Sequence, residues 1–221
     1  MAMLGKEVRM GRLVNPESNK MMAITVDHAI SRGIAPMTGI QPIQEAIDRI
    51  IAGRPDAMTM TKGIAERCMY RHAGQVSLLL KCSSYAPVHP TRDVVFGSVD
   101  EAVRMGADAV SVGAMTLGDF QDVQFAQIGR IAEECMAKGM PLIAHIYPKG
   151  EQVPEKERTS WEHIAYCCRS ACELGVDIVK TTYTGDPDSM AKVISCVPSS
   201  FRVVIQGGDA CKTLDDYLHM T

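Results

Sequence analysis

The sequence of 221 residues lacks the features that mark several classes of protein. It contains no run of lysine and arginine, and its 23 basic residues are outnumbered by 26 acidic ones, for a formal net charge of −3. Because nucleic acids and anionic membranes attract a basic stripe or a net positive field, we expect neither as a partner. The eight cysteines contain no C-x-x-C pair, so we expect them to be reduced and mostly buried.

Long apolar segments are also absent. The first twenty residues mix charges with glycines, and no later window approaches the ~20 apolar residues of a membrane span. We therefore expect a cytoplasmic protein without a membrane-spanning helix. A G-x-G-x-x-G turn is missing as well, so nothing indicates a dinucleotide site.

What the sequence does contain is a repeated unit, in which a helical run is followed by a glycine and a short apolar strand. The stretches MGADAVSV and LGVDIVKT are its most similar copies. Each glycine stands where a helix needs a left-handed residue before the chain turns into a strand. The units are centred on Gly53, Gly74, Gly106, Gly139 and Gly175.

Seven strands follow from these units, with helical stretches between them. Amphipathic stripes at 40–51 and 125–136 predict two of the helices. Strands that alternate with helices indicate an α/β fold with a parallel sheet, and the number of units favours a (β/α)8 TIM barrel. We expect a single barrel domain over residues 1–221, with the eighth βα unit absent because the sequence stops at Thr221. The predicted strands are 22–26, 57–60, 76–81, 109–112, 142–145, 178–181 and 201–205.

Polar residues at the carboxyl ends of these strands are the candidates for catalysis, because the active sites of TIM barrels lie there. Lys180 interrupts the strand DIVKTTY, and alternation with Val179 points it into the barrel if Val179 faces the helices. A buried amine is unfavourable unless its pKa falls or a carboxylate pairs with it. Lys180 is therefore either a structural ion-pair partner or an amine kept partly neutral, which can form a Schiff base with a ketone.

Asp27 and His28 follow the first strand. If Ile24 and Val26 face the helices, Asp27 shares the barrel interior with Lys180, where a carboxylate balances positive charge and holds substrate hydroxyls. The alternative for Asp27 is a helix cap or a turn residue. The alternative for His28 is a structural hydrogen bond.

Tyr147 ends the fifth predicted strand, and alternation places His145 on the same side. A phenol at the rim of the barrel passes a proton to or from a substrate hydroxyl, although such a tyrosine also serves in packing. Gly207 and Gly208 follow the seventh strand, where barrels often bind phosphate through backbone amides. A simple turn is the alternative for these two glycines.

Taken together, these candidate residues and the sequence around them resemble the archaeal-type class I aldolases of the deoxyribose-phosphate aldolase superfamily. That branch contains fructose-bisphosphate aldolase, aminodideoxyheptulosonate synthase and an autoinducer-processing thiolase. The resemblance covers nearly the whole chain and rests on the stretches VDHAI, MGADAVSV, PLIAHIYPKG, DIVKTTYTGD and QGGDACKT. It implies a Schiff base on Lys180, with Tyr147 as general acid and base and Asp27 in contact with substrate near the reacting carbons.

The same resemblance implies that His28 assists, that Gly207 and Gly208 hold a substrate phosphate, and that no metal or organic cofactor is needed. It also implies a homo-oligomer. The chain departs from the family pattern at Ala29, where a glycine is usual, and at Lys149, where an arginine is usual. Asp209 follows the two glycines, and the Gly-Arg-Asn phosphate motif of the eighth strand is absent. Phosphate binding is the part of the implied function that these departures affect most.

The leading hypothesis is a Schiff-base aldolase of carbohydrate metabolism that makes or cleaves a carbon–carbon bond of a phosphorylated ketose, with fructose 1,6-bisphosphate, a glycolytic substrate, in first place. The first alternative is 2-amino-3,7-dideoxy-D-threo-hept-6-ulosonate synthase, a transaldol reaction on the same residues. A metal-dependent aldolase or epimerase with ligands among Asp27, His28, His89 and His145 is a further alternative, although these histidines share no helical spacing. The last is a barrel that acts as a non-catalytic subunit.

Overall fold

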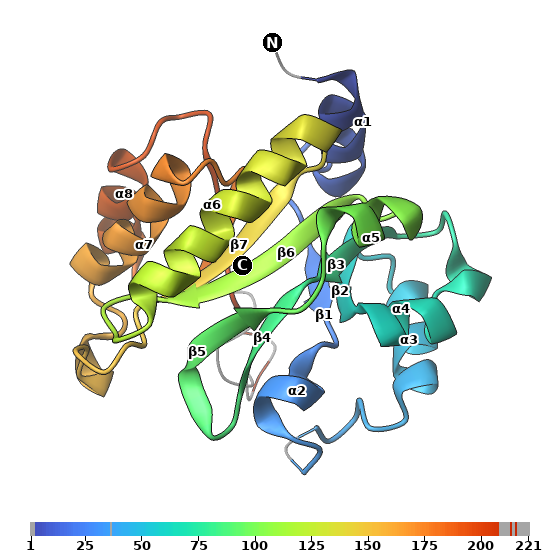
Figure 1. The fold of residues 1–221 in the computed structure, drawn as a ribbon, viewed down its shortest axis with the longest axis horizontal. Helices are drawn as coiled ribbons and strands as arrows, with labels where there is room; N and C mark the ends of the chain where they lie inside the picture. Colours follow the sequence, from blue (N-terminus) through green and yellow to red (C-terminus); the bar gives the residue numbers. More distant parts are fainter. Residues whose placement is uncertain (1–2, 36, 208–212, 214, 216–221) are drawn as a thin grey trace.

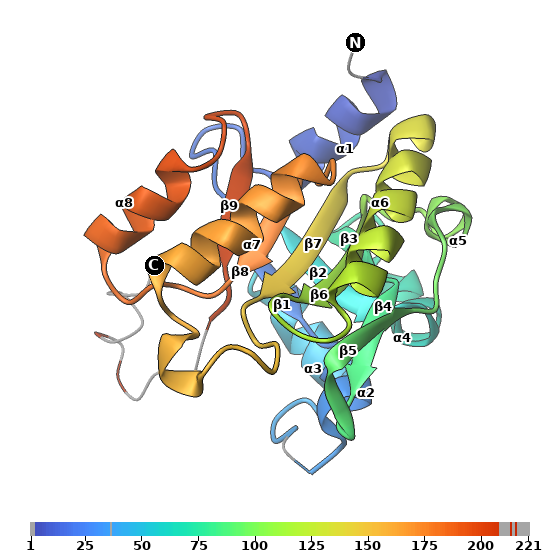
Figure 2. The same cartoon turned by 60° about the vertical axis from the view of Figure 1, so that its left-hand side comes forward.

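The structure is a computed structural model that describes residues 3–35, 37–207, 213 and 215. Its centre is a curled sheet of seven parallel strands (Figures 1 and 2). All seven predicted strands are confirmed, with small differences at their ends. Their neighbours in the sheet follow chain order: β1 (Ala23–Thr25), β2 (Ala57–Thr61), β3 (Ser77–Lys81), β6 (Ala109–Met115), β7 (Leu142–Tyr147), β8 (Ile178–Thr181) and β9 (Arg202–Ile205).

This is the sheet of a TIM barrel that lacks its eighth strand within the described residues, as expected. In that part of the chain β9 and β1 are the two edges of the sheet. The segment before β1 still meets the start of β9, because Nη2 of Arg202 donates to Oδ1 of Asn19 at 3.3 Å.

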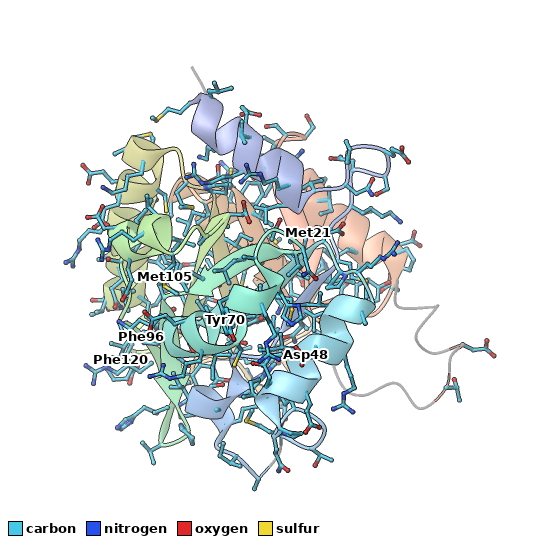
Figure 3. All side chains as sticks on the ribbon, turned by 90° about the vertical axis from the view of Figure 1, so that its right-hand side faces the viewer. Met21, Asp48, Tyr70, Phe96, Met105 and Phe120 are labelled. Atoms are coloured by element: carbon cyan, nitrogen blue, oxygen red, sulfur yellow. The ribbon has the colours of Figure 1, made fainter. Side chains whose placement is uncertain are left out.

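Helices cover the outer face of the sheet, with α6, α7 and α8 side by side in both views (Figures 1 and 2). The predicted stripes at 40–51 and 125–136 correspond to α3 and α6. Asp48 of α3 accepts from Nε2 of His72 at 2.6 Å and so ties α3 to the turn that follows α4 (Figure 3). The helices are α1 (Leu4–Leu13), α2 (His28–Arg32), α3 (Ile43–Ala52), α4 (Lys62–Cys68), α5 (Val99–Arg104), α6 (Gln121–Lys138), α7 (Trp161–Glu173) and α8 (Pro187–Ser195), with 3-10 turns at Tyr70–His72 and Glu155–Glu157.

Two apolar layers lie on the two faces of the sheet, because side chains alternate along each strand. Val179 and Val26 pack into the outer layer with the helices. Ile178 of the same strand as Val179 packs into an inner layer with Leu13 and Leu79. The predicted inward and outward alternation of side chains is therefore confirmed for the first and sixth strands, β1 and β8. In both strands the next inward residue toward the carboxyl end is polar, Thr25 in β1 and Lys180 in β8.

The prediction that every stretch between strands is helical is wrong between β3 and α5. An antiparallel hairpin lies there, formed by β4 (Ser83–Ala86) and β5 (His89–Val95). It projects beyond the carboxyl end of the sheet next to α2 (Figure 1). Gln124 of α6 holds it, because its buried amide accepts from the backbone N–H of Asp93 and donates to the carbonyl of Thr91, both at 3.1 Å.

Four of the five repeat glycines have the predicted positive φ, for example Gly139 at 60° after α6 and Gly175 at 82° after α7. Gly53 differs. Its φ is −76°, and the positive φ of that turn is at Arg54, at 55°. The turn after α3 reverses one residue later than the pattern predicts, so a non-glycine residue takes the less favourable conformation.

Helix α1, which the repeat pattern does not predict, lies across the amino ends of the strands (Figure 1). Leu13 at its end is fully buried in the inner apolar layer. Two aspartates connect this helix to the sheet. Asp108 accepts from the N–H of Leu78 at 3.2 Å and pairs with Arg12 at 3.1 Å. Asp177 accepts from the N–H of Leu142 at 2.9 Å and pairs with Lys6 at 2.6 Å.

The cysteines behave as predicted in the described part of the chain, where all seven are free and five are buried. Burial raises the pKa of the Cys167 and Cys168 thiols to about 12, so both stay protonated at neutral pH. Among the described helices, none has the length and apolar character to cross a membrane.

Shortening Leu13 tests the contribution of α1 to stability. We expect Leu13→Ala to lower the free energy of unfolding by about 2–5 kcal/mol, because it leaves a cavity in the inner layer. Leu4→Ala on the same helix is the control, since Leu4 is 79% exposed, and it should change the stability by less than ~0.5 kcal/mol. Denaturant unfolding measures both, and equal midpoints for the two variants would contradict the prediction.

Candidate active site

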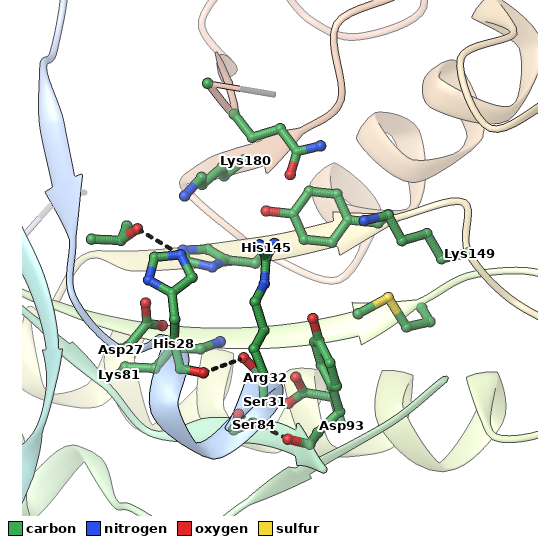
Figure 4. A pocket seen from close by; sticks show the side chains of 16 residues that line it. Asp27, His28, Ser31, Arg32, Lys81, Ser84, Asp93, His145, Lys149 and Lys180 are labelled. Carbon is green, nitrogen blue, oxygen red and sulfur yellow. Dashed lines mark hydrogen bonds between the residues drawn. The ribbon is translucent and has the colours of Figure 1, made fainter. Parts of the chain in front are cut away.

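A cavity of about 290 Å³ opens at the carboxyl end of the sheet (Figure 4). Helix α1 lies at the opposite end of the sheet (Figure 1). Strands β1, β3, β6, β7 and β8 contribute side chains to it, and α2, the hairpin and the segment after β9 complete the wall. Every predicted site residue that the structure describes lines this cavity: Asp27, His28, His145, Tyr147, Lys180 and Gly207. Gly208, the remaining predicted residue, lies outside the described residues.

Lys180 projects into the cavity from β8, the strand that pairs with β7 on one side and β9 on the other. Burial lowers the pKa of its amine. The positive charges of Lys81 and Arg32 lower it further, while Asp27 opposes the shift. A larger fraction of the amine is therefore neutral at a given pH than for a lysine in water, which favours attack on a carbonyl carbon.

Asp27 stands two residues after the end of β1, at the N-cap position of α2. Its side chain makes no capping hydrogen bond, although the alternative interpretation of this residue is a cap. The carboxylate lines the cavity instead and acts electrostatically on both Lys180 and Tyr147. It is therefore placed to balance a positive charge on the amine or on an iminium.

His28 is the first residue of α2. Its Nε2 lies 3.4 Å from Oγ1 of Thr25, and its buried Nδ1 has no hydrogen-bond partner among the described residues. Burial lowers the pKa of the ring. Asp27 raises it, and Arg32 and Lys180 lower it. The structural hydrogen bond of the alternative interpretation accounts for only one of the two ring nitrogens, and the other is available to a ligand.

His145 lies next to Lys180 in the parallel register of β7 and β8. Its Nε2 is 3.1 Å from Oγ of Ser111, and the ring is buried. Burial and the nearby positive charges, with Lys81 first among them, hold its pKa well below the ordinary value of 6.5. The ring is therefore neutral at physiological pH and acts only as a hydrogen-bonding group.

Tyr147 ends β7. The backbone of Thr116 and of Lys149 fixes its position, since both N–H groups donate to the Tyr147 carbonyl at 2.9 Å. The Lys149 amine lies 5.1 Å from the centre of the phenol ring. Burial raises the pKa of the phenol, and the negative charge of Asp27 raises it further. The phenol is therefore a proton donor in the resting site.

Gly207 borders the cavity at the end of the segment that follows β9, and it is exposed. The preceding residue, Gln206, is held to β8, because its N–H donates to the carbonyl of Thr181 at 2.8 Å. This attachment brings the backbone of Gly207 to the rim of the cavity. The role of the two glycines in holding a phosphate stays a prediction.

Two cationic residues of the cavity escaped sequence reasoning. Lys81 ends β3 and is only 6% exposed, and its amine donates to Oγ of Ser83 at 3.3 Å. The signal for it was available, because the strand SLLLK ends in an inward lysine in the same way as DIVK. Arg32 lies at the end of α2 and points into the cavity (Figure 4). No pattern in the sequence indicates that a helix this short faces the cavity.

The hairpin adds three further lining residues that sequence reasoning missed: Ser84, Tyr85 and Asp93. Lys149 also faces the cavity, which brings the cationic side chains there to four, with Arg32, Lys81 and Lys180. Asp27 and Asp93 are its two carboxylates. The excess of positive charge favours an anionic ligand.

The set of metal ligands considered from the sequence does not come together. His89 lies on β5 and is exposed, and it is not part of the cavity wall that holds Asp27, His28 and His145. Among the described residues, no group of three histidine, cysteine or carboxylate side chains has the geometry of a metal site. The geometry therefore favours the amine of Lys180 as the reactive group of this cavity.

The pKa of Lys180 can be tested by the pH dependence of its reaction with an amine-specific reagent, followed by peptide mass spectrometry. We expect the midpoint below the ordinary value of 10.5, because burial disfavours the ammonium. Asp27→Asn removes the interaction that raises this pKa, so the midpoint should move to still lower pH. Asp100→Asn, at an exposed carboxylate paired with Lys138 at 2.6 Å, is the control and should leave it unchanged. A higher midpoint in Asp27→Asn would contradict the charge balance described above.

Comparisons with known proteins agree with this geometry. Residues 21–220 match the family described as DeoC/LacD family aldolase. The chain is 29% identical to 2-amino-3,7-dideoxy-D-threo-hept-6-ulosonate synthase of Halobacterium salinarum, over 93% of this chain and 74% of the relative. It is 33% identical to the class 1 fructose-bisphosphate aldolase of Thermoproteus tenax, over 74% of this chain and 60% of the relative.

The fold is similar to that of a solved Schiff-base-forming fructose-1,6-bisphosphate aldolase. The TM-score is 0.85 at 30% identity, and the match covers 97% of this chain and 85% of the other. The family match spans most of the chain, and this structural match includes the strands that form the cavity. The chain therefore belongs to the DeoC/LacD family of aldolases, which are carbon–carbon lyases.

Proposed function

We propose that this protein is a class I aldolase that makes or cleaves a carbon–carbon bond of a phosphorylated ketose through a Schiff base on Lys180. The observation that carries the proposal is the environment of Lys180, a largely buried amine of lowered pKa at the end of a barrel strand, beside Asp27. Fructose 1,6-bisphosphate is the substrate that we infer first, since relatives and solved neighbours are named for it.

The reaction begins at the amine of Lys180. Its neutral form attacks the ketone carbon, the carbinolamine loses water, and a protonated imine remains. A base then removes the proton of the hydroxyl on the carbon that will become the aldehyde carbon. The electrons of that bond move into the iminium, which becomes an enamine, and the aldehyde half leaves. Protonation of the enamine carbon and hydrolysis release the ketone half and restore the amine.

Tyr147 and Asp27 serve this sequence in different ways. The raised pKa of the Tyr147 phenol makes its phenolate a strong base once formed, so the residue suits the transfer of a proton to and from the substrate hydroxyl. The Asp27 carboxylate stabilises the iminium on Lys180 and orients hydroxyl groups. The neutral rings of His28 and His145 supply hydrogen bonds to the substrate without adding charge.

The phosphate groups would be held by the excess of cations. Arg32 and Lys149 project into the cavity, and Gly207 offers its backbone at the rim. Arg32 supplies planar, bidentate donors, whereas Lys149 supplies a point charge. We propose that Gly208 completes the backbone contact, as the family resemblance implies.

A second candidate function is the synthesis of 2-amino-3,7-dideoxy-D-threo-hept-6-ulosonate. It is supported by the relative from Halobacterium salinarum, which matches over a longer part of this chain than the aldolase of Thermoproteus tenax does. Both reactions need the same amine and the same proton carrier. Incubation with each set of substrates and analysis of the products by mass spectrometry distinguishes the two.

Several expectations from the sequence stay proposals alongside this function. We propose a single domain, a cytoplasmic location, a role in glycolysis and a homo-oligomeric state. Sedimentation analysis of the purified protein tests the last of these, since a monomer at micromolar concentration would contradict it.

Reduction with borohydride tests the Schiff base directly. We expect incubation with dihydroxyacetone phosphate and borohydride to attach the ketone carbon skeleton to Lys180, and peptide mass spectrometry identifies the position. Lys180→Arg should give no adduct. Lys192→Arg is the control, because Lys192 of α8 packs over Trp161 outside the cavity. This variant should be labelled at Lys180 to the same extent as the unmodified protein. An adduct on Lys81 instead of Lys180 would contradict the assignment.

Removal of the phenol hydroxyl tests the role of Tyr147. We expect Tyr147→Phe to reduce turnover by about 10²–10⁴-fold, the usual contribution of a general acid or base. The borohydride adduct on Lys180 should still form with the ketone, because it does not depend on cleavage. Tyr166→Phe on α7, whose hydroxyl accepts from Gln121 at 2.9 Å away from the cavity, is the matched control and should keep full turnover. Equal turnover in the two variants would rule out the proposed role.

A further inference from the structure

The Asp93 carboxylate is the most unusual polar group of the cavity that the mechanism above does not use. Asp93 is only 4% exposed, and its buried Oδ1 has no hydrogen-bond partner among the residues that the structure describes. A buried acceptor without a partner is unfavourable, so its presence needs an explanation. Because Asp93 lines the cavity, a ligand can supply the missing donor.

The position of this carboxylate is tightly defined. It fills the space above Gly113, where a Cβ added to the glycine would come within 2.5 Å of Oδ2 of Asp93. Gly113, His145 and Lys180 are neighbours in the parallel register of β6, β7 and β8. Asp93 therefore stands in the row of His145 and Lys180, at the place that the missing side chain of Gly113 would occupy.

The backbone of Asp93 is fixed as well. Its N–H donates to Oε1 of Gln124 at 3.1 Å, and its carbonyl accepts from Nε2 of Gln127 at 3.4 Å. Both glutamines belong to α6. The carboxylate is thus held in place before any ligand arrives, which is the arrangement expected of a residue that selects a substrate.

The distance to Lys180 indicates which half of the substrate Asp93 meets. Adjacent strands are about 4.8 Å apart, so the position above Gly113 is two strands, or roughly 10 Å, from the Cα of Lys180. Asp93 acts electrostatically on Tyr147, whose pKa its negative charge raises. Figure 4 shows Lys180 and Asp93 on opposite sides of the cavity in that view. Asp93 therefore borders the half of the substrate whose hydroxyl exchanges a proton with Tyr147.

We propose that Asp93 accepts a hydrogen bond from the hydroxyl next to the aldehyde carbon of that half, and so selects 2-hydroxyaldehydes as the partners of the enzyme-bound ketone. In fructose 1,6-bisphosphate this is the C5 hydroxyl. The aldehyde half carries hydroxyl groups on C4 and C5, and the C4 hydroxyl is the one that exchanges a proton with Tyr147. The inference rests on the proposed aldolase function and adds a specificity residue to it.

The test compares two aldehydes in condensation with dihydroxyacetone phosphate: glyceraldehyde 3-phosphate and its 2-deoxy analogue, 3-hydroxypropanal phosphate. We expect the unmodified enzyme to prefer the hydroxylated aldehyde in kcat/KM by about 10- to 100-fold, the loss that accompanies a missing hydrogen bond to a charged group. Asp93→Asn should lose most of this preference, mainly through glyceraldehyde 3-phosphate. An enzyme without the preference, or an equal loss with both aldehydes in Asp93→Asn, overturns the proposal.

Gly113→Ala provides an independent variant that keeps the charge of Asp93. The added Cβ has to displace the carboxylate, so the preference for the hydroxylated aldehyde should fall as it does in Asp93→Asn. Gly129→Ala in α6, where a Cβ meets nothing within 4 Å, is the matched control and should keep the preference. Thermal unfolding of each variant identifies any that fails to fold, and the unmodified enzyme with the two aldehydes still decides the question in that case.

Borohydride trapping of dihydroxyacetone phosphate separates this inference from the proposed function. We expect the adduct on Lys180 to form equally in the unmodified enzyme and in Asp93→Asn, because the ketone half does not reach Asp93. No adduct in the unmodified enzyme would overturn the aldolase function itself. A normal adduct in the unmodified enzyme together with a weakened one in Asp93→Asn would overturn only the assignment of Asp93 to the aldehyde half.

Discussion

The two-residue alternation of parallel strands is the constraint on which the rest of this structure depends. Each strand sends one set of side chains into the outer layer under the helices and the other set toward the axis of the sheet. Toward the amino ends the inward set is apolar, as at Ile178, and is covered by Leu13. One step further along the same strand the inward residue is Lys180. Along β8, the apolar residue that supports the cavity and the lysine proposed to form the Schiff base are therefore successive inward-facing positions.

The electrostatics of the cavity follow from this arrangement. Lys81 from β3 and Lys180 from β8 face the same small volume, joined by Arg32 from α2, and the positive charges of Lys81 and Arg32 lower the pKa of Lys180. The lowered pKa values of Lys180 and His145 share this origin with burial. An anionic ligand would relieve this repulsion on binding, whereas without one the positive charges of Lys81 and Arg32 favour the neutral form of the Lys180 amine.

Much of the fold and part of the site could be predicted from the sequence. Lys180, Asp27 and Tyr147 could be predicted to face the cavity because they lie at the carboxyl ends of predicted strands, where alternation decides the direction of a side chain. Asp93 could not be found in this way, because the hairpin that carries it interrupts the repeat and has no glycine-strand unit of its own. Gly113, the glycine that makes room for the Asp93 carboxylate, also belongs to a different strand. Long-range packing of this kind leaves no local pattern.

The attachment of the hairpin has an evolutionary consequence. β4 and β5 form a separate two-stranded sheet, and the glutamines of α6 hold it through backbone groups, whose geometry does not depend on the side chains of the hairpin. The hairpin can therefore accumulate substitutions and changes of length at its tip without altering the strand register of the barrel. Such a segment is a route by which an aldolase scaffold can diversify, since the hairpin part of the cavity wall can change separately from β8, the strand that carries Lys180.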